Sequence, residues 1–356
     1  MIATLPNSNS LGVLQLFIKE GGSRYLKEGL PAMLGYFGYT GNEGYSALKM
    51  AREAEQRGVS LSYTVERDYM GFKAQFIKSE LPFVMQVFKT IQNVEYEEYK
   101  YKDIMIKSES ETWGAFSTQN VFIKEYLHLL SFRGQGLGKS IYPASAPTLS
   151  DIVESSKVLK NAKLFGIGFE KSELSQFDIS LTKSSVSATK NVFIGGETSI
   201  QKPFANTVAI AVPISSPANA LALKRSLGDS TSFVKYGHSQ SVLGQLIPAN
   251  SSIYSSVCSH EHSPSLFQFT ITSTSPDGFK KCYTAIKESL TKVKSTLEPL
   301  KEENFQSQLS QLINNDLSVT TTNGNAIDAA KEALSHLQTK KSVVYVGNCN
   351  AIPPFE

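Results

Sequence analysis

Residues Leu11-Gly12-Val13-Leu14-Gln15-Leu16-Phe17-Ile18 predict a buried strand, because Gln15 is the only polar side chain in the run. A turn signal, Gly21-Gly22-Ser23, follows, and an apolar segment then opens at Gly29-Leu30-Pro31. Pro31 suits the first turn of a helix, since its missing N–H has no hydrogen-bond partner to lose there. The chain therefore begins with a strand, a turn and an apolar helix.

The rest of the first half alternates strands and helices. Two strand-like segments, 59–66 and 69–77, flank a charged turn, and Pro82 then starts an amphipathic helix that reaches Ile91. A long helix is expected over about 96–112, and a closing strand over 164–169. The half therefore contains a strand, a helix, a strand pair, further helices and a strand.

The second half repeats this order. It starts with a strand over 206–212 and a helix that begins at Ser216, and a strand pair, 252–258 and 266–272, follows. Helices and a terminal strand over 343–347 complete it. The parallel is one of order and predicts duplicated α+β domains. We expect them over residues 1–183 and 204–356, joined by a linker, 184–203, with one short strand at 192–194.

Composition excludes several classes of protein. The 356 residues are 41% hydrophobic and 19% charged, which suits two domains with buried cores. Lys plus Arg number 35 against 32 Asp plus Glu, so nothing favours a nucleic-acid partner. Three cysteines are too few for a disulfide framework, and no apolar run reaches the length of a membrane span.

The stretch Arg133-Gly134-Gln135-Gly136-Leu137-Gly138-Lys139-Ser140 superficially resembles a phosphate-binding loop. Such a loop begins with glycine, where this sequence has Arg133, and a helix must follow directly, whereas Pro143 interrupts the continuation. We interpret the stretch as a glycine-rich surface loop between helices, with nucleotide binding as the weaker alternative.

The densest group of potential metal ligands is Cys258-Ser259-His260-Glu261-His262. On a strand, Cys258, His260 and His262 would share one side and could hold zinc. The stretch also suits a polar hairpin connection, which needs no metal and is the favoured interpretation. His128 lies in an apolar helical segment, so we expect a partly buried histidine with its hydrogen bonds satisfied.

Three stretches together resemble the family of the mitochondrial processing peptidase and the pitrilysin-type zinc peptidases. They are the first strand with Gly21-Gly22-Ser23-Arg24-Tyr25 after it, the block from Ser46 to Ile91, and residues 127–138. The last is similar to the family's His-x-x-Ala-Phe-x-Gly-x-x-Leu-Gly run. The resemblance covers nearly the whole chain and implies an α+β fold of two homologous domains, each a mainly antiparallel sheet flanked by helices.

The family's catalytic motif, His-x-x-Glu-His, should lie on the helix just after Gly29. There two histidines bind zinc and the glutamate activates water. This sequence has Ala32, Gly35 and Tyr36 at the three positions, and none of them can bind zinc or act as the base. The resemblance therefore implies an inactive peptidase homologue, with no catalytic, cofactor-binding or metal-binding residues.

Two further expectations concern this lost site. The third zinc ligand of the family, a glutamate on a later helix, would fall near Ser108 or Glu109, and one carboxylate cannot hold catalytic zinc alone. We also expect Tyr36, Phe37 and Tyr39 to fill or line the vacated site.

Family members without the motif include the core subunits of respiratory complex III, the ubiquinol–cytochrome c reductase, and the non-catalytic α subunit of the processing peptidase. That α subunit has a long glycine-rich loop for presequence binding, whereas residues 218–244 here contain only Gly228, Gly237 and Gly244. The resemblance therefore favours a structural core subunit that serves assembly and stability, with a presequence-binding processing subunit as the alternative.

The same resemblance implies where the protein works and with what. Its partners would be core protein 1 and the cytochrome b, cytochrome c1 and Rieske subunits of a dimeric complex III, and the redox chemistry would belong to those subunits. The chain itself would carry no cofactor. It would lie peripherally on the matrix side of the mitochondrial inner membrane, attached through other subunits, with no nucleic-acid partner.

Overall fold

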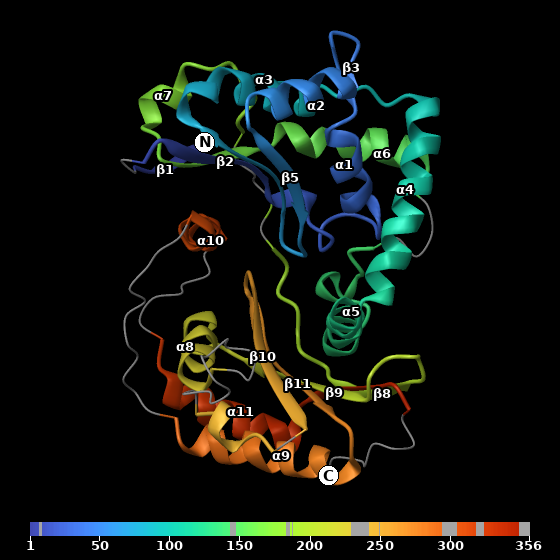
Figure 1. Ribbon diagram of the computed structural model, residues 1–356, viewed down its shortest axis with the longest axis vertical. Helices are drawn as coiled ribbons and strands as arrows, with labels where there is room; N and C mark the ends of the chain where they lie inside the picture. Colours follow the sequence, from blue (N-terminus) through green and yellow to red (C-terminus); the bar gives the residue numbers. More distant parts are fainter. Residues whose placement is uncertain are drawn as a thin grey trace. The chain divides into compact units, whose positions relative to one another are not determined.

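The computed structural model describes residues 1–6, 9–142, 147–182, 186, 188–228, 242–248, 250–293, 305–317 and 324–348, with side chains from residue 308 onward in the segment that starts at 305. Pro143 and Gly237, which the sequence analysis names, and Cys349, the third of its three cysteines, lie outside these residues. The chain forms two compact units (Figure 1), each described by itself below. The first comprises residues 1–117, 139–187 and 302–316, and the second comprises residues 118–138, 188–301 and 317–356.

The first unit is built on a five-stranded sheet of order β1-β7-β2-β6-β5. Its strands are β1 (Ile2–Leu5), β2 (Leu11–Ile18), β5 (Ser60–Val65), β6 (Met70–Ile77) and β7 (Lys163–Ile167). Only β1 and β7 pair in parallel, and the other three pairs are antiparallel. A separate two-stranded ribbon joins β3 (Gly41–Asn42) to β4 (Tyr45–Ser46).

Helices cover both faces of this sheet. They are α1 (Leu30–Gly38), α2 (Ala47–Gln56), α3 (Leu81–Gln92), α4 (Glu98–Ser117), α6 (Leu149–Ser155), α7 (Lys171–Ser175) and α10 (Phe305–Asp316), with short 3₁₀ turns η1 (Lys19–Gly21), η2 (Lys78–Glu80) and η4 (Ser156–Lys160). The main apolar core lies between the sheet and α1 and α3 and contains Leu14, Leu16 and Leu164. The side chain of Lys163 points to the opposite face, where α10 lies against β7 and β1.

The second unit repeats the first sheet strand for strand. Its order is β10-β11-β9-β12-β8, and β12 with β8 is again the single parallel pair. The strands are β8 (Gly196–Ile200), β9 (Thr207–Ile214), β10 (Ser251–His260), β11 (Ser263–Ser273) and β12 (Ser342–Val346). The expected duplicated α+β architecture, with mainly antiparallel sheets, is confirmed.

The helices of the second unit are α5 (Gln119–Phe132), α8 (Pro217–Leu227), α9 (Pro276–Thr291) and α11 (Ala326–Thr339), with 3₁₀ turns η3 (Gly136–Gly138) and η5 (Gly244–Leu246). One apolar core packs α8, α9 and α11 against the sheet through Val208, Phe267 and Val343. The helix α5 contacts β12, β9 and β8, and Ser131 on it binds Ser342, whose side chain points away from that core.

The units exchange one helix each. Within the order of elements, α5 and α10 are counterparts, since each follows the strand pair and first helices of its own half. Each sheet has an outer face, the one that points away from its main apolar core. Yet α5 covers the outer face of the second sheet, and α10 covers the outer face of the first sheet. The compact units therefore divide the chain differently from the expected domains 1–183 and 204–356, and those boundaries stay a prediction.

The expected linker differs from the structure in its details. The predicted strand at 192–194 is wrong, because these residues form no strand, and β8 begins only at Gly196. Residues 188–203 belong to the second unit, where β8 pairs with β12. In the part of the chain that the structure describes, no helix combines the length and the apolarity that crossing a bilayer requires.

Candidate functional site

The helix α1 follows Gly29 and is the helix on which the family's His-x-x-Glu-His motif should lie. Its N-cap, Gly29, has φ +79°, and Pro31 lies in its first turn as predicted. All nine residues of α1 are buried, because α3, α4 and α6 and the strands β5 and β6 surround it. The sequence LPAMLGYFG of this helix contains no imidazole, thiol or carboxylate.

Gly35, one of the three motif positions, packs closely against a neighbouring strand. A Cβ atom added to it would lie 2.6 Å from Cδ2 of Tyr63, a residue of β5. Real side chains do not approach so closely, so the Tyr63 ring occupies the space that a glutamate at position 35 would need. Ala32 and Tyr36 are buried in the same core. The vacated position is therefore filled by a side chain from β5.

Polar side chains from α1, β5 and α4 contact one another beside the former motif positions. The rings of Tyr36 and Tyr63 meet edge to face at 5.7 Å, and the Tyr63 hydroxyl donates to Oε2 of Glu111 on α4 over 3.4 Å. Burial, with the Glu111 carboxylate beside them, raises the pKa of both tyrosines well above the usual value. The two phenols are thus fixed as neutral hydrogen-bond donors. They cannot serve as bases at neutral pH.

The helix α4 supplies the neighbours of this cluster. Ser108 is buried, and Glu109, at the adjacent position, is exposed. Neither is the side chain that meets Tyr36 and Tyr63, since that is Glu111, one turn beyond Ser108. Lys107 lies 5.4 Å above the Tyr36 ring and 3.8 Å from the Glu111 carboxylate. The glutamate position of the zinc site thus falls beside a tyrosine–glutamate contact.

The expectation for the aromatic residues of this region is confirmed for one residue and changed for two. Tyr36 lines the former site. Phe37 instead packs into the core with its ring 5.0 Å from that of Tyr96. Tyr39 donates to the Ser62 carbonyl over 2.8 Å and so ties the end of α1 to β5. Tyr63 was missed by the sequence analysis, because only strand pairing brings it beside α1.

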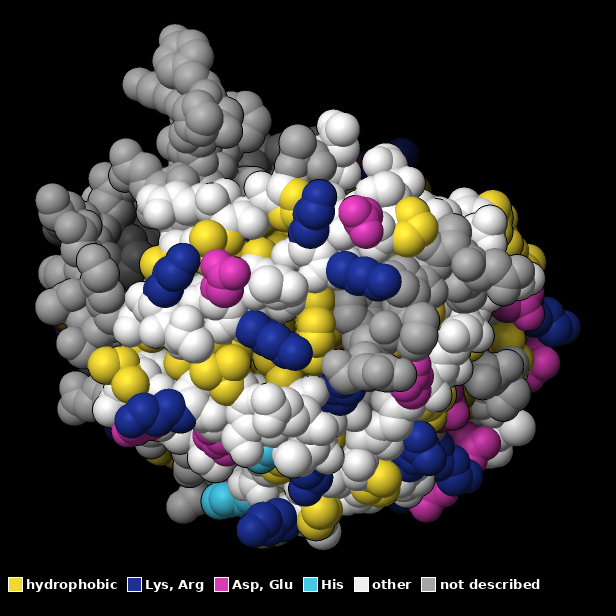
Figure 2. Space-filling model, turned by 90° about the horizontal axis from the view of Figure 1, so that it is seen from below, with side chains coloured by type: hydrophobic (Ala, Val, Ile, Leu, Met, Phe, Trp, Pro, Cys, Tyr) yellow, Lys and Arg dark blue, Asp and Glu magenta, His cyan; other side chains and the backbone are white. Residues whose placement is uncertain are grey.

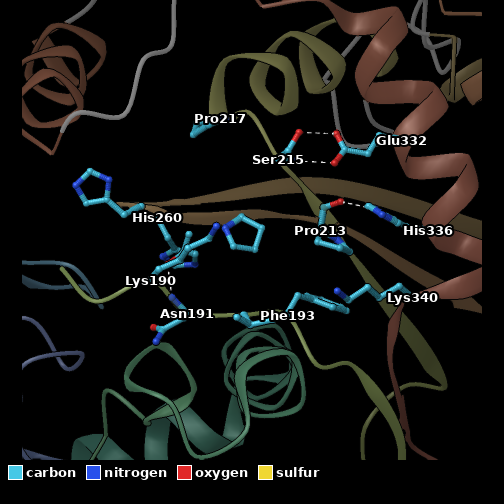
Figure 3. A pocket seen from close by; sticks show the side chains of 14 residues that line it. Lys190, Asn191, Phe193, Pro213, Ser215, Pro217, His260, Glu332, His336 and Lys340 are labelled. Atoms are coloured by element: carbon cyan, nitrogen blue, oxygen red, sulfur yellow. Dashed lines mark hydrogen bonds between the residues drawn. The ribbon is translucent and has the colours of Figure 1, made fainter.

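The second unit contains a cavity of about 590 Å³, shown in Figure 3. It lies between the 190–193 segment, the turn that joins β10 to β11, the end of β9 and the helix α11. Its size falls in the range of small-molecule sites. Its labelled side chains include Lys190, Phe193, His260 and Lys340.

Several polar groups of this cavity are held by hydrogen bonds. Glu332 on α11 accepts from the Ser215 backbone N–H over 2.9 Å and from its hydroxyl over 3.1 Å (Figure 3). His336, one turn further along α11, binds the Pro213 carbonyl through Nδ1 over 2.7 Å. Lys340 lies 5.8 Å from the centre of the Phe193 ring. These hydrogen bonds hold α11 against the end of β9.

The possible zinc ligands near residue 260 are not brought together as a metal site. Cys258 and His260 belong to β10, and the strand register shifts between them, whereas His262 lies in the turn with φ +51°. Because of this shift the simple alternation of side chains does not hold. Among the described residues, no three His, Cys, Asp or Glu side chains could hold a metal ion together. The hairpin interpretation of this stretch is confirmed by the pairing of β10 with β11.

The other two motifs have structural roles. His128 is fully buried on α5, where we expected partial burial, and its Nδ1 binds the Lys124 carbonyl over 2.8 Å. After α5, Gly138 approaches the Phe132 carbonyl so closely that an added Cβ would lie 2.9 Å from it. Leu137 is buried beside Phe132, so this stretch is packed more tightly than the surface loop we expected.

Figure 2 shows the surface of the protein on the side that carries α9. Most Lys and Arg side chains on this face lie singly among hydrophobic and uncharged ones. A nucleic-acid interface needs a continuous basic stripe. The described residues on this face present no such stripe.

Comparison with known proteins gives relatives of one kind. No family model matches the chain. Cytochrome b-c1 complex subunit 2 of Debaryomyces hansenii is 26% identical over 47% of this chain and 46% of its own length. The protein of the same name from Cryptococcus neoformans is 28% identical over 64% of this chain and 57% of its own length. The one from Saccharomyces cerevisiae is 23% identical over 55% of this chain and 57% of its own length. The chain thus spans about half the length of the curated relatives it matches.

A solved structure matches the whole chain. It is the peptidase M16 inactive domain from Pseudomonas fluorescens, with a TM-score of 0.77 over 100% of this chain and 96% of that one, at 11% identity. At this identity the match bears on the fold alone. The chain is therefore similar in sequence to the fungal cytochrome b-c1 complex subunit 2 proteins and shares the fold of that M16 peptidase domain.

Proposed function

We propose that the chain is a non-catalytic structural subunit of ubiquinol–cytochrome c reductase, of the core protein 2 type, which serves the assembly and stability of complex III. The observation that carries the proposal is the similarity to several fungal proteins named cytochrome b-c1 complex subunit 2. Because the alignments span about half of those proteins, their role as whole proteins comes to this chain as part of the proposal.

The lost catalytic helix supports a role without chemistry. A catalytic zinc site needs three protein ligands and a position open to water. Here the corresponding residues of α1 are Ala32, Gly35 and Tyr36, and the Tyr63 ring fills the space beside Gly35. The helix therefore contributes packing in place of a hydrolytic site, and the subunit would act through its surfaces.

The proposed partners and location follow from the same role. The chain would pair with core protein 1 and belong with cytochrome b, cytochrome c1 and the Rieske protein to a dimeric assembly. Haem, iron–sulfur cluster and quinone would be bound by those other subunits. We place it peripherally on the matrix side of the mitochondrial inner membrane, where attachment through partner subunits would hold it.

The decisive test is extraction of membranes with a mild detergent, followed by separation of the native complexes. Tagged chain should migrate with subunits that show the absorption bands of b-type and c-type haem. A wash at high salt, which removes weakly adsorbed proteins, is the control and should leave this co-migration intact. A particle made of this chain and one partner, free of haem, would contradict the proposal.

A second measurement separates the proposal from a processing-peptidase subunit. Fluorescent presequence peptide is titrated into the purified complex, and cleavage is followed on the same samples. We expect neither saturable binding nor cleavage, and elemental analysis should find no stoichiometric zinc in the isolated chain. Saturable peptide binding by a haem-free particle would favour the presequence-binding role instead.

A further inference from the structure

The outer face of α4 exposes three large apolar side chains in one row. Tyr99, Ile106 and Trp113 have 61%, 70% and 76% of their surface exposed, and Trp113 is the only tryptophan of the chain. Single exposed apolar residues are common, but a spacing of seven residues places these three along one side of the helix. The opposite side of α4 faces α1 through Ile104 and Ser108, which are buried. The row is therefore an apolar helix face that no other described element of the first unit covers.

The row is symmetric about its centre. Ile106 lies seven residues from both Tyr99 and Trp113. In an antiparallel pair of such helices, Ile106 meets its own copy, and each Tyr99 lies level with the partner's tryptophan. Aromatic pairs of this kind, and the apolar contact between them, favour association. A surface that matches itself under a two-fold rotation is the surface that a symmetric dimer needs.

The charges beside the row select the antiparallel direction. Lys102 and Glu109 lie on the same edge of the row, four residues before and three residues after Ile106. In an antiparallel pair, Lys102 of one copy comes within one residue of the level of Glu109 of the other, on the same edge, and the reciprocal pair forms as well. In a parallel pair in register, lysine would face lysine and glutamate would face glutamate. The parallel pair is therefore opposed by like charges.

We propose that α4 is a self-association surface on which a second copy of this chain packs its own α4 antiparallel, with the two-fold axis at Ile106. A single helix pair buries less area than a stable, independent dimer needs, so the contact is weak in isolation. It gains strength when another contact already holds the two copies near one another. The inference concerns the chain's own surface and stands whether or not the chain belongs to complex III.

Cysteine cross-linking tests the geometry directly. In an antiparallel pair, Ile106→Cys places two thiols on the axis, whereas Tyr99→Cys or Trp113→Cys alone places its thiols about 21 Å apart, from 1.5 Å per residue. A disulfide requires Cβ atoms roughly 4 Å apart. On mild oxidation of the full chain in membrane extracts, I106C should give a band at twice the monomer mass. Y99C and W113C should cross-link only when the two variants are mixed.

Matched controls exclude non-specific oxidation. The unsubstituted chain reports the background from its own cysteines, Cys258, Cys282 and Cys349. Leu48→Cys, at an exposed position on α2, reports random collision and should stay monomeric. Because all the substituted positions are exposed, the variants should retain the circular dichroism of the parent chain, and this is measured beside the gels.

Charge reversal tests the direction of pairing. In the I106C background, Lys102→Glu or Glu109→Lys should each slow cross-linking by about three- to tenfold, because like charges then face one another. The double reversal K102E/E109K should restore the parent rate. Self-cross-linking of Y99C alone would overturn the antiparallel geometry. An I106C adduct with a different polypeptide, or no adduct above the L48C background, would overturn the assignment of a second copy.

Discussion

The outer faces of the two sheets are covered by counterpart helices in chemically different ways. On the second sheet, α5 is joined by a hydroxyl pair, Ser131 Oγ to Ser342 Oγ at 2.8 Å, beside an apolar cluster that includes Phe132. On the first sheet, α10 is joined by the ion pair of Lys163 and Asp316 at 2.5 Å, with about a tenth of each side chain exposed. The same position in a repeated fold thus depends on dispersion forces and a neutral hydrogen bond in one unit and on buried charge in the other.

This difference determines how each contact responds to damage. A buried ion pair contributes little net stability, because desolvation of the charges offsets their attraction, but the loss of one partner leaves an uncompensated charge. A neutral hydroxyl pair is less sensitive, since an orphaned hydroxyl costs far less than an orphaned carboxylate. The contact of α10 should therefore be the more fragile of the two.

The largest effect is expected for Lys163→Met. It leaves the Asp316 carboxylate buried without its cation, and we expect a loss of about 3–5 kcal/mol in the free energy of unfolding, measured by urea denaturation. Lys89→Met is the matched control, because its pair with Asp178 is exposed, and it should cost less than about 1 kcal/mol. Equal effects of the two substitutions would show that α10 is not held by buried charge.

A second contrast concerns α1 and α8, which follow the central strands β2 and β9. Pro31 and Pro217 align them, so Gly35 corresponds to Leu221. Gly35→Glu forces a carboxylate against the Tyr63 ring and should cost about 3 kcal/mol or more. Leu221→Glu, on a half-buried position of a helix with only five of eleven residues buried, should cost about 1 kcal/mol.

A double-mutant cycle sharpens this contrast. In a Tyr63→Ala background the space beside Gly35 opens, so Gly35→Glu should cost less there than in the parent chain. An unchanged cost would mean that the Tyr63 ring does not restrict position 35.

The tyrosines near α1 give the first unit a dependence on alkaline pH. Burial raises the pKa of Tyr45 and of Tyr96 to about 12. Unfolded tyrosine ionises near pH 10, so between pH 10 and 12 the unfolded chain loses protons that the folded chain keeps. Stability should fall over this range, by about 1–2 kcal/mol after allowance for solvent exposure. Unfolding midpoints at a series of pH values measure the loss, and Tyr96→Phe should make the fall smaller, while Tyr36 and Tyr63 keep their contribution.

The smallest effect is expected at the α5 contact. Ser131→Ala leaves the Ser342 hydroxyl buried without its partner and should cost about 1 kcal/mol. Ser117→Ala, at an exposed hydroxyl on α4, is the control and should change stability by less than about 0.5 kcal/mol. If Ser131→Ala destabilised the chain as much as Lys163→Met, the proposed difference between the two contacts would be wrong.

Local pattern was sufficient to predict most helices and strands, but it did not predict which compact unit each of them joins. The run from Leu11 to Ile18 and the start at Pro31 were predictable, because periodicity and proline placement act over a few residues. The strand β8 was placed at 192–194, since its sequence GETSI lacks an apolar run and its position depends on pairing with β12. The exchange of α5 and α10 leaves no local signal, because either helix presents an apolar stripe.

The site shows the same limit. The absence of zinc ligands at Ala32, Gly35 and Tyr36 followed from the residue types alone. The side chain that takes their place, Tyr63, lies 28 residues further along the chain than Gly35, and its contact depends on the packing of β5 against α1. A substitution that removes a function can be found in a sequence, whereas the group that fills the space requires a structure.

The exchange of helices also bears on synthesis at the ribosome. Most of the first unit has been made by residue 187, but its last segment ends at residue 316. At roughly 5–20 residues per second, the 129 residues between these points take about 6–26 s to translate. Throughout that interval Lys163 has been synthesised but its partner Asp316 has not. The face of the first sheet that α10 will cover is then accessible to chaperones or to neighbouring nascent chains. The two halves of this protein therefore cannot mature one after the other, and the first is completed only when the second is nearly made.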